Sequence, residues 1–285
     1  MTIKVPGWVP PTLGLVSRVA PKAVARVVGH RVLRPRQNSP QSWEIEPLRG
    51  DEPSARELTL ANGLAALCWE PLAAARAPWV FAQHGWEGRP TQFRPLAGAL
   101  VAQGYRVLAI EGPGHGRSPG KQASPWLFAQ ALLAAQAEFG APDAVVGHSL
   151  GGGAVPIALA HGLRARRVAT LGAPAAMSEI TENFLKAVGV GGAARSELRR
   201  LMDEHGGRPM RELDPEVLAA LAPVAQVPAL IVHCVDDVIV APDQGRRLAA
   251  AWPAATLHET RGLGHRNLLR DPATVAAVVA FFQAG

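Results

Sequence analysis

A serine lies between two glycines in the segment Gly-His-Ser-Leu-Gly at 147–151, directly after the apolar run 144–146. A strand, a tight turn that holds a serine, and a helix that begins with small residues form the layout of a nucleophile elbow. Such a turn forces the serine backbone into a strained conformation and raises its hydroxyl above the edge of the sheet. We therefore expect Ser149 to be a nucleophile for acyl groups, with an acid and a base beside it.

The candidate acid and base lie later in the chain. The apolar run 229–235 predicts a buried strand, and Asp236 and Asp237 follow at its carboxyl end. We choose Asp237 as the acid, because it directly precedes the apolar triplet Val-Ile-Val, and we expect Asp236 to be a helper or a turn-forming residue. His265 lies in a glycine-bearing loop after the last predicted strand, where a base is needed. The order Ser149, Asp237, His265 predicts a triad in which the carboxylate orients the imidazole and the imidazole takes the serine proton.

Backbone amides on both sides of the serine can stabilise an oxyanion. The predicted third strand ends in Gln-His-Gly-Trp at 83–86, where glycine lets an amide point into the site. The expected donors are the amides of Trp86 and Leu150. We expect the imidazole of His84 to hydrogen-bond neighbouring loops, and we also include this residue in the substrate-binding set. The residues expected to contribute to substrate binding are His84, Trp86, His148 and Trp126.

The rest of the chain alternates between apolar runs and helical patterns. Two short strands are predicted around Asn62-Gly63, within 57–70, and the further runs are 79–82, 105–110, 144–147, 167–171, 229–235 and 256–259. Continuous apolar runs are typical of strands that are buried on both faces of a parallel sheet. Helical patterns at 93–103, 126–139, 244–251 and 272–282 separate them. The fold class is therefore α/β, with a doubly wound, mostly parallel eight-stranded sheet flanked by helices.

One interval breaks the alternation. Residues 175–225 contain helical patterns separated by glycine-rich turns and no convincing strand. An insertion after the sixth strand would lie over the carboxyl end of the sheet, so we expect a helical lid there. The predicted organisation is a basic N-terminal arm and linker at 1–52, and a catalytic domain at 53–285 that carries this lid.

Composition restricts the class of protein. The chain has 285 residues, of which 48% are hydrophobic and 18% are charged, which suits one large α/β domain. Its apolar runs are shorter than a bilayer requires, and prolines interrupt the first 20 residues where a secretion signal would lie. We therefore expect a cytoplasmic protein. The two cysteines lie in separate apolar segments without metal-site spacing, so we expect buried thiols and no metal.

The positive charge is concentrated in the N-terminal arm. Residues 1–36 hold seven basic and no acidic side chains, so a net charge of +6 for the whole chain leaves −1 for the remainder. A nearly neutral body argues against nucleic-acid binding.

The arm also contains an amphipathic helical pattern within 22–34. One helical face is predicted to carry four valines, and a basic ladder lies on another face; the valines are Val24, Val27, Val28 and Val32. Such a helix predicts weak contact of residues 12–36 with an anionic membrane surface. The alternative, which the small bulk of alanine and valine favours, is packing on the main domain or on a second subunit as a homodimer.

With these motifs the chain resembles the α/β-hydrolase superfamily, and in particular its single-domain serine hydrolases with a small helical lid. The loop Glu-Gly-Pro-Gly-His-Gly-Arg-Ser at 111–118 resembles the loop after the fourth strand in that family, with glutamate in place of the usual leading aspartate. The resemblance extends from about residue 57 to 285. A serine at 149 argues against the dehalogenase and epoxide hydrolase chemistries of related enzymes, which need an acid there.

The resemblance implies hydrolysis of a carboxylic ester of a small or medium acyl substrate through an acyl-enzyme that water resolves. No cofactor is required by this mechanism. The same residues would serve a thioesterase, a lactonase, an amidase or an acyltransferase, so these remain open. A non-catalytic binding protein of the same fold is the alternative from a different functional class.

Overall fold

The computed structural model describes residues 9–45, 55–72, 76–206 and 209–284. Their framework is one eight-stranded sheet with the order β1-β2-β4-β3-β5-β6-β7-β8. β2 runs antiparallel to both of its neighbours, and the remaining neighbours pair in parallel. The predicted mostly parallel sheet is confirmed. The strands are β1 (Arg56–Thr59), β2 (Ala65–Trp69), β3 (Trp79–Gln83), β4 (Arg106–Ile110), β5 (Ala144–His148), β6 (Arg167–Leu171), β7 (Ala229–Cys234) and β8 (Ala255–Thr260).

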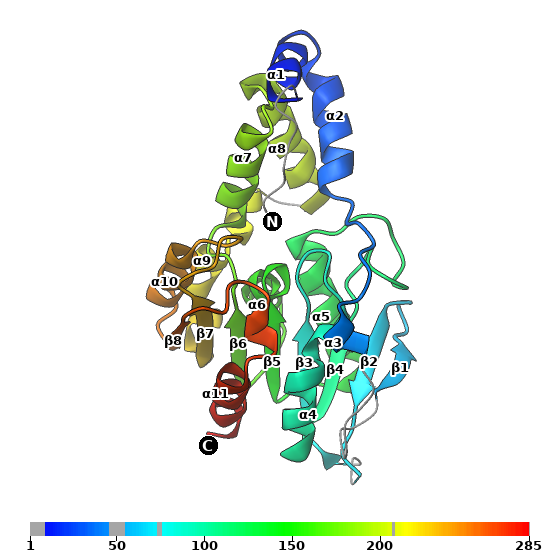
Figure 1. The fold of residues 1–285 in the computed structure, drawn as a ribbon, viewed down its shortest axis with the longest axis vertical. Helices are drawn as coiled ribbons and strands as arrows, with labels where there is room; N and C mark the ends of the chain where they lie inside the picture. Colours follow the sequence, from blue (N-terminus) through cyan, green and yellow to red (C-terminus); the bar gives the residue numbers. More distant parts are fainter. Residues whose placement is uncertain (1–8, 46–54, 73–75, 207–208, 285) are drawn as a thin grey trace.

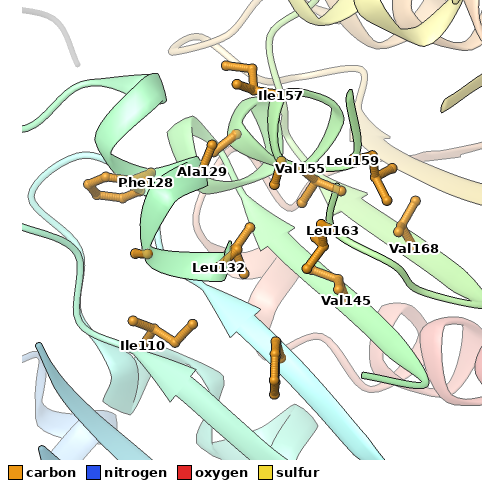
Figure 2. Close-up of a cluster of buried hydrophobic side chains, with 14 of the residues drawn as sticks. Ile110, Phe128, Ala129, Leu132, Val145, Val155, Ile157, Leu159, Leu163 and Val168 are labelled. Atoms are coloured by element: carbon orange, nitrogen blue, oxygen red, sulfur yellow. The ribbon is translucent and has the colours of Figure 1, made fainter. Parts of the chain in front are cut away.

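Helices cover both faces of the sheet (Figure 1). One face packs against α4 (Arg94–Ala102) and α11 (Pro272–Gln283), and the other against α5 (Pro125–Phe139), α6 (Leu150–Ala160) and α10 (Pro242–Ala251). Figure 2 shows part of the second interface, where Phe128 and Leu132 of α5 and Val155 of α6 lie over the strands. Because successive side chains of a strand point to opposite faces, Val145 enters this cluster while Val146 enters the other. This two-sided burial explains why the strands appear in the sequence as continuous apolar runs.

Short helical elements complete the chain. They are α3 (Ser42–Ile45), η2 (Pro90–Phe93), η3 (Met210–Leu213), α9 (Pro215–Ala219), η4 (Val224–Gln226) and η5 (Asn267–Leu269). No helix among the described residues is long and apolar enough to cross a membrane.

A helical insertion separates β6 from β7, as predicted. Its main helices are α7 (Met177–Ala187) and α8 (Gly192–Gly206). The base of the insertion is held to α10, because Gln244 Oε1 accepts the amides of Ala175 and Ala176 at 3.0 Å each. Arg247 of α10 adds ion pairs of 2.7 Å to Glu179 and to Glu216. The role of this insertion as a lid stays a prediction.

The N-terminal arm packs on the insertion. Its helices, α1 (Val9–Val19) and α2 (Pro21–Val32), lie beside α7 and α8, and together the four helices form a lobe above the sheet that we call the cap (Figure 1). The cap has its own apolar cluster, formed by Val24, Ala25, Leu185, Val190, Ala194 and Leu198. Gly29 lets α2 and α8 approach closely, since a Cβ atom on Gly29 would lie 2.7 Å from Leu198 Cδ1.

This packing corrects one detail of the prediction for the arm. Val24, Val28 and Val32 face the cap cluster, whereas Val27 points outward with 66% of its surface exposed. The arm contacts the insertion, which the predicted organisation assigns to the main domain, and the division at residue 52 stays a prediction. Contact with a membrane and homodimer formation stay predictions.

We expect the cap to lose stability separately from the sheet when its cluster is weakened. Leu198→Ala removes a fully buried side chain, which costs about 2–4 kcal/mol in comparable cores. Hydrogen exchange followed by mass spectrometry should show faster exchange in α2 and α8 and unchanged exchange in β5. Leu15→Ala, at a position of α1 that is 64% exposed, is the matched control and should change neither region. Equal acceleration in cap and sheet would contradict this separation.

Candidate active site

Ser149 occupies the turn between β5 and α6. Its backbone has φ 53° and ψ −120°, a conformation that residues with side chains rarely adopt. Two hydrogen bonds hold it there: the Ser149 amide donates to Leu171 O at 2.9 Å, and Ser149 O accepts from the Gly153 amide at 2.9 Å. The side chain is half-buried. Strain of this kind is maintained only where the surrounding structure enforces it, which is common at functional sites.

Close backbone contacts explain the glycines around Ser149. A Cβ atom on Gly147 would lie 2.5 Å from Gly151 O, and one on Gly151 would lie 2.2 Å from Gln83 O. These neighbours are backbone atoms, which cannot rotate away as a side chain would. Glycine is therefore required at both positions so that α6 can begin directly beneath the end of β3.

Asp237 and His265 form a buried pair. His265 Nδ1 donates to Asp237 Oδ2 at 2.7 Å, and Asp237 Oδ1 accepts the amides of Ile239 and Val240 at 2.8 and 3.0 Å. Burial raises the pKa of Asp237, but these hydrogen bonds and the nearby imidazole outweigh it and hold the pKa below its ordinary value. The Asp237 carboxylate is thus kept charged beneath the imidazole. Asp236 supports the neighbouring loop. Its Oδ2 accepts a hydrogen bond from the Gly262 amide at 2.6 Å, and Gly262 belongs to the loop that carries His265.

The fold brings this pair to the serine turn. A Cβ atom on Gly172, the residue after β6, would lie 3.1 Å from His265 Nδ1 and 3.5 Å from Asp237 Oδ2. The amide of Ser149 donates to Leu171 O, one residue before Gly172, so Ser149 and the Asp237–His265 pair lie at the same edge of the sheet. Within the described chain, no hydrogen bond joins Ser149 Oγ to His265, and such bonds often form only with substrate bound.

The two predicted oxyanion donors flank the same turn. Leu150 is the first residue of α6, so its amide has no acceptor within the helix. On the other side, a Cβ atom on Gly85 would lie 2.8 Å from Ser149 Cβ, which shows how closely the loop after β3 passes over the serine. Trp86 follows directly. Its half-buried indole lies edge-on to His115, with ring centroids 6.0 Å apart.

His84 is fully buried and connects loops instead of facing a substrate. Its Nδ1 donates to Gly85 O at 2.7 Å, and its Nε2 accepts the Gly112 amide at 2.9 Å. Burial holds its pKa well below the ordinary value, so the ring is neutral. The expected loop contacts are present, and the expectation of substrate contact is corrected because both nitrogens are occupied and no surface is exposed.

His148 and Trp126 are also not placed as pocket residues. His148 is buried and its Nε2 donates to the backbone oxygen of His265 at 3.0 Å, so it holds the loop of the candidate base. Burial lowers its pKa to about 3. Trp126 packs edge-on against His161, with ring centroids 4.7 Å apart. Ser149 directly precedes α6 and His161 directly follows it, so the length of this helix, about 16 Å, separates His161 from Ser149.

His233 is a further residue that supports the site, and the motifs of the sequence do not single it out. The Nε2 atom of this buried residue of β7 donates to Val240 O at 2.9 Å and lies 3.6 Å from Asp237 Oδ2. It therefore supports the turn whose amides hold the candidate acid. Its position four residues before Asp237 is the sole sequence signal, and that spacing has no special meaning at the end of a strand. No cluster of three or more potential metal ligands occurs in the described part of the chain.

Comparison with known proteins agrees with this architecture. Residues 79–278 match the model of the alpha/beta hydrolase family, a region that includes the serine turn, Asp237 and His265. The chain belongs to the alpha/beta hydrolase family. This family membership supports a hydrolase.

Individual relatives of this alpha/beta hydrolase are distant. A serine hydrolase-like protein of Dictyostelium discoideum is 32% identical over 102 residues, which are 34% of this chain and 28% of that protein's length. The esterase RhEst1 from Rhodococcus sp. ECU1013 is 19% identical with a TM-score of 0.57, and the match covers 81% of this chain and 99% of the esterase. A bacterial membrane phospholipase A is 17% identical with a TM-score of 0.60, covering 98% of this chain and 94% of the other. These structural likenesses show the fold, and the last spans the cap as well.

We expect Gly151→Ala to disrupt the serine turn. The added methyl group would lie 2.2 Å from Gln83 O, so α6 must shift, and we expect a loss of roughly 3 kcal/mol or more in the free energy of unfolding. Urea denaturation measures this loss. Gly192→Ala is the control, because a Cβ atom at that cap position meets nothing within 4 Å. Equal stability of the two variants would contradict the close approach.

The Asp237 carboxylate should stabilise the fold at neutral pH and lose this effect in acid. Its pKa is lower in the folded protein than the ordinary value of about 3.9, so the stabilisation is complete above that value and falls as pH drops through the lower folded pKa. Asp237→Asn leaves an amide opposite the two backbone amides and should be less stable at pH 7. Unfolding in urea at pH 7 and pH 3 should show a narrower gap between wild type and variant at pH 3. An unchanged gap would count against the charged carboxylate.

Proposed function

We propose that this alpha/beta hydrolase is a serine hydrolase that cleaves carboxylic esters of small or medium acyl substrates. The observation that carries the proposal is a strained, half-buried serine at the same edge of the sheet as a buried, hydrogen-bonded Asp237–His265 pair. A serine needs an adjacent base to become a nucleophile, and that base needs an orienting partner. In the proposal His265 is the base and Asp237 is its orienting partner.

In the proposed reaction, His265 Nε2 takes the proton of Ser149 as Oγ attacks the ester carbonyl carbon. The amides of Trp86 and Leu150 stabilise the oxyanion that forms. The imidazolium, held by Asp237, gives the proton to the departing alkoxide, which leaves as an alcohol. Water then attacks the acyl-enzyme with His265 again as base, and it releases a carboxylic acid and free Ser149.

The ester class is supported by the chemistry of the site and by the names of two structural neighbours, an esterase and a phospholipase A. Trp86 is the proposed binding residue, because it is half-buried and follows Gly85, which lies against Ser149. An indole there suits an apolar acyl chain or alcohol group.

Labelling with a fluorophosphonate tests the nucleophile. Wild type should be labelled, and Ser149→Ala should take up no label and lose at least about a thousandfold in kcat on p-nitrophenyl esters. Ser196→Ala, which changes an exposed serine of α8, is the control and should behave as wild type. A panel of acyl lengths from acetate to palmitate, with matched thioesters and lactones, then identifies the substrate class. An unlabelled wild type, or equal labelling of Ser149→Ala, would refute the proposal.

A further inference from the structure

A segment that the sequence indicated to be a linker makes a dense set of contacts with the loop after β3. We call residues 36–44 the strap; it leads from α2 of the cap to α3 beside the sheet (Figure 1). Arg36 donates to Glu87 from its backbone amide at 3.1 Å, from Nε at 2.8 Å and from Nη2 at 3.1 Å. Asn38 Nδ2 adds a fourth hydrogen bond to the same carboxylate, at 3.2 Å. One carboxylate of the loop is thus held by two residues of the strap.

The far end of the strap holds the same loop at a second place. Arg89 donates from Nη2 to Asn38 O. The side chain of Glu44 is 1% exposed, accepts from Thr91 Oγ1 at 2.6 Å and lies 3.4 Å from Arg89 Nε. A buried carboxylate with these partners is not a chance surface contact. The strap and the segment after β3 therefore contact each other through hydrogen bonds at both Asn38 and Glu44.

The residue that the strap holds has an unusual backbone. Glu87 has φ 55°, and among the described residues the only other non-glycine residue with positive φ is Ser149. The Gly88 amide bonds to Gly85 O at 3.0 Å, so Trp86 and Glu87 are the two central residues of a tight turn. Positive φ at the second central position normally calls for glycine or asparagine. Glutamate stays there because its carboxylate is held by the strap and its amide donates to His115 Nε2 at 3.0 Å.

This turn carries one of the two oxyanion donors of the proposed function. The amide of Trp86 takes no part in the turn's own hydrogen bond, and its direction depends on the conformation of the residues on either side. On the N-terminal side of Trp86, the buried His84 ring fixes the backbone through its hydrogen bonds to Gly85 O and to the Gly112 amide. On the C-terminal side of Trp86, the backbone is fixed by the hydrogen bonds of Glu87 to the strap and to His115.

We propose that Arg36, acting through Glu87, positions the Trp86 amide for stabilisation of the oxyanion, so that the N-terminal strap is part of the active-site support. This inference rests on the proposed function. Arg36 and Asn38 are positioning residues, since neither touches the reacting atoms. The contact also links the cap to the chemistry, because α2 leads directly into the strap.

The test is the kinetics of full-length variants on the best p-nitrophenyl ester, expressed per site titrated with fluorophosphonate. Arg36→Ala should lower kcat about tenfold or more and change KM less than twofold, because an oxyanion donor acts mainly on the transition state. Affinity for a trifluoromethyl ketone, which forms an oxyanion on the serine, should fall by a similar factor. Arg36→Lys should not restore kcat, because an ammonium group cannot reproduce the two-pronged contact of a guanidinium.

A double-mutant cycle shows whether Arg36 acts through Glu87. Glycine adopts positive φ without strain, so in Glu87→Gly the turn no longer needs the strap. Arg36→Ala should then change kcat less than twofold in the Glu87→Gly background. Arg56→Ala is the control, since this exposed arginine pairs with Glu70 at the sheet edge, away from the site.

The outcomes separate the two proposals. If wild type is labelled and active while folded Arg36→Ala keeps its kcat within twofold, the positioning role is overturned, and the same holds if only the melting temperature falls. Should Arg36→Ala fail to fold, Asn38→Ala removes one of the four bonds and should lower kcat more modestly; no change there also overturns the role. A wild type that neither takes label nor hydrolyses esters refutes the proposed function itself, and the role of the strap with it.

Discussion

At the start of α6 the backbone passes so close to the end of β3 that a methyl group on Gly151 would lie 2.2 Å from Gln83 O. This contact determines the geometry of everything around it. It places Ser149 directly under the loop that carries Trp86, and it forces the serine into its positive φ. The parallel neighbours β5 and β6 align Gly172 with the same turn, and His265 lies against that glycine, where a Cβ atom would be 3.1 Å from its Nδ1. A site assembled in this way depends on backbone packing more than on any single side chain.

Buried neutral histidines connect the loops around that contact. His84, His115, His148 and His233 each donate from one ring nitrogen to a backbone oxygen, and burial lowers the pKa of each. A neutral imidazole suits this role because it offers a donor and an acceptor on a rigid ring and brings no charge into the interior. His84 and His115 use both nitrogens and tie the loop after β3 to the loop after β4. The candidate base, His265, therefore lies near histidines that have a structural role, since they hydrogen-bond backbone groups of the surrounding loops.

The molecule has two apolar lobes with different connections. The sheet and its helices form the larger one, and the cap forms the smaller one from segments that are more than 140 residues apart in the chain. Salt bridges and the Gln244 contacts fasten the insertion to α10, while the strap fastens the N-terminal helices to the loop after β3. The second connection ends at the loop that passes over the serine turn. The surroundings of the candidate site thus include the N-terminal segment as well as the family domain.

Local pattern was enough to predict the strands and the helical insertion, and to indicate Ser149, Asp237 and His265 as residues that follow strands of the sheet. Two-sided burial leaves continuous apolar runs, and the carboxyl ends of parallel strands meet at one edge, so residues that follow such runs are brought together by topology alone. The roles of His148 and Trp126 could not be predicted, because the direction of a side chain depends on what packs against it. The pairing of Arg36 with Glu87 spans 51 residues and crosses a predicted domain boundary, and no periodicity marks it. Such contacts follow from the three-dimensional meeting of loops, where distance along the chain has no influence on which charges and hydrogen-bonding groups come into reach.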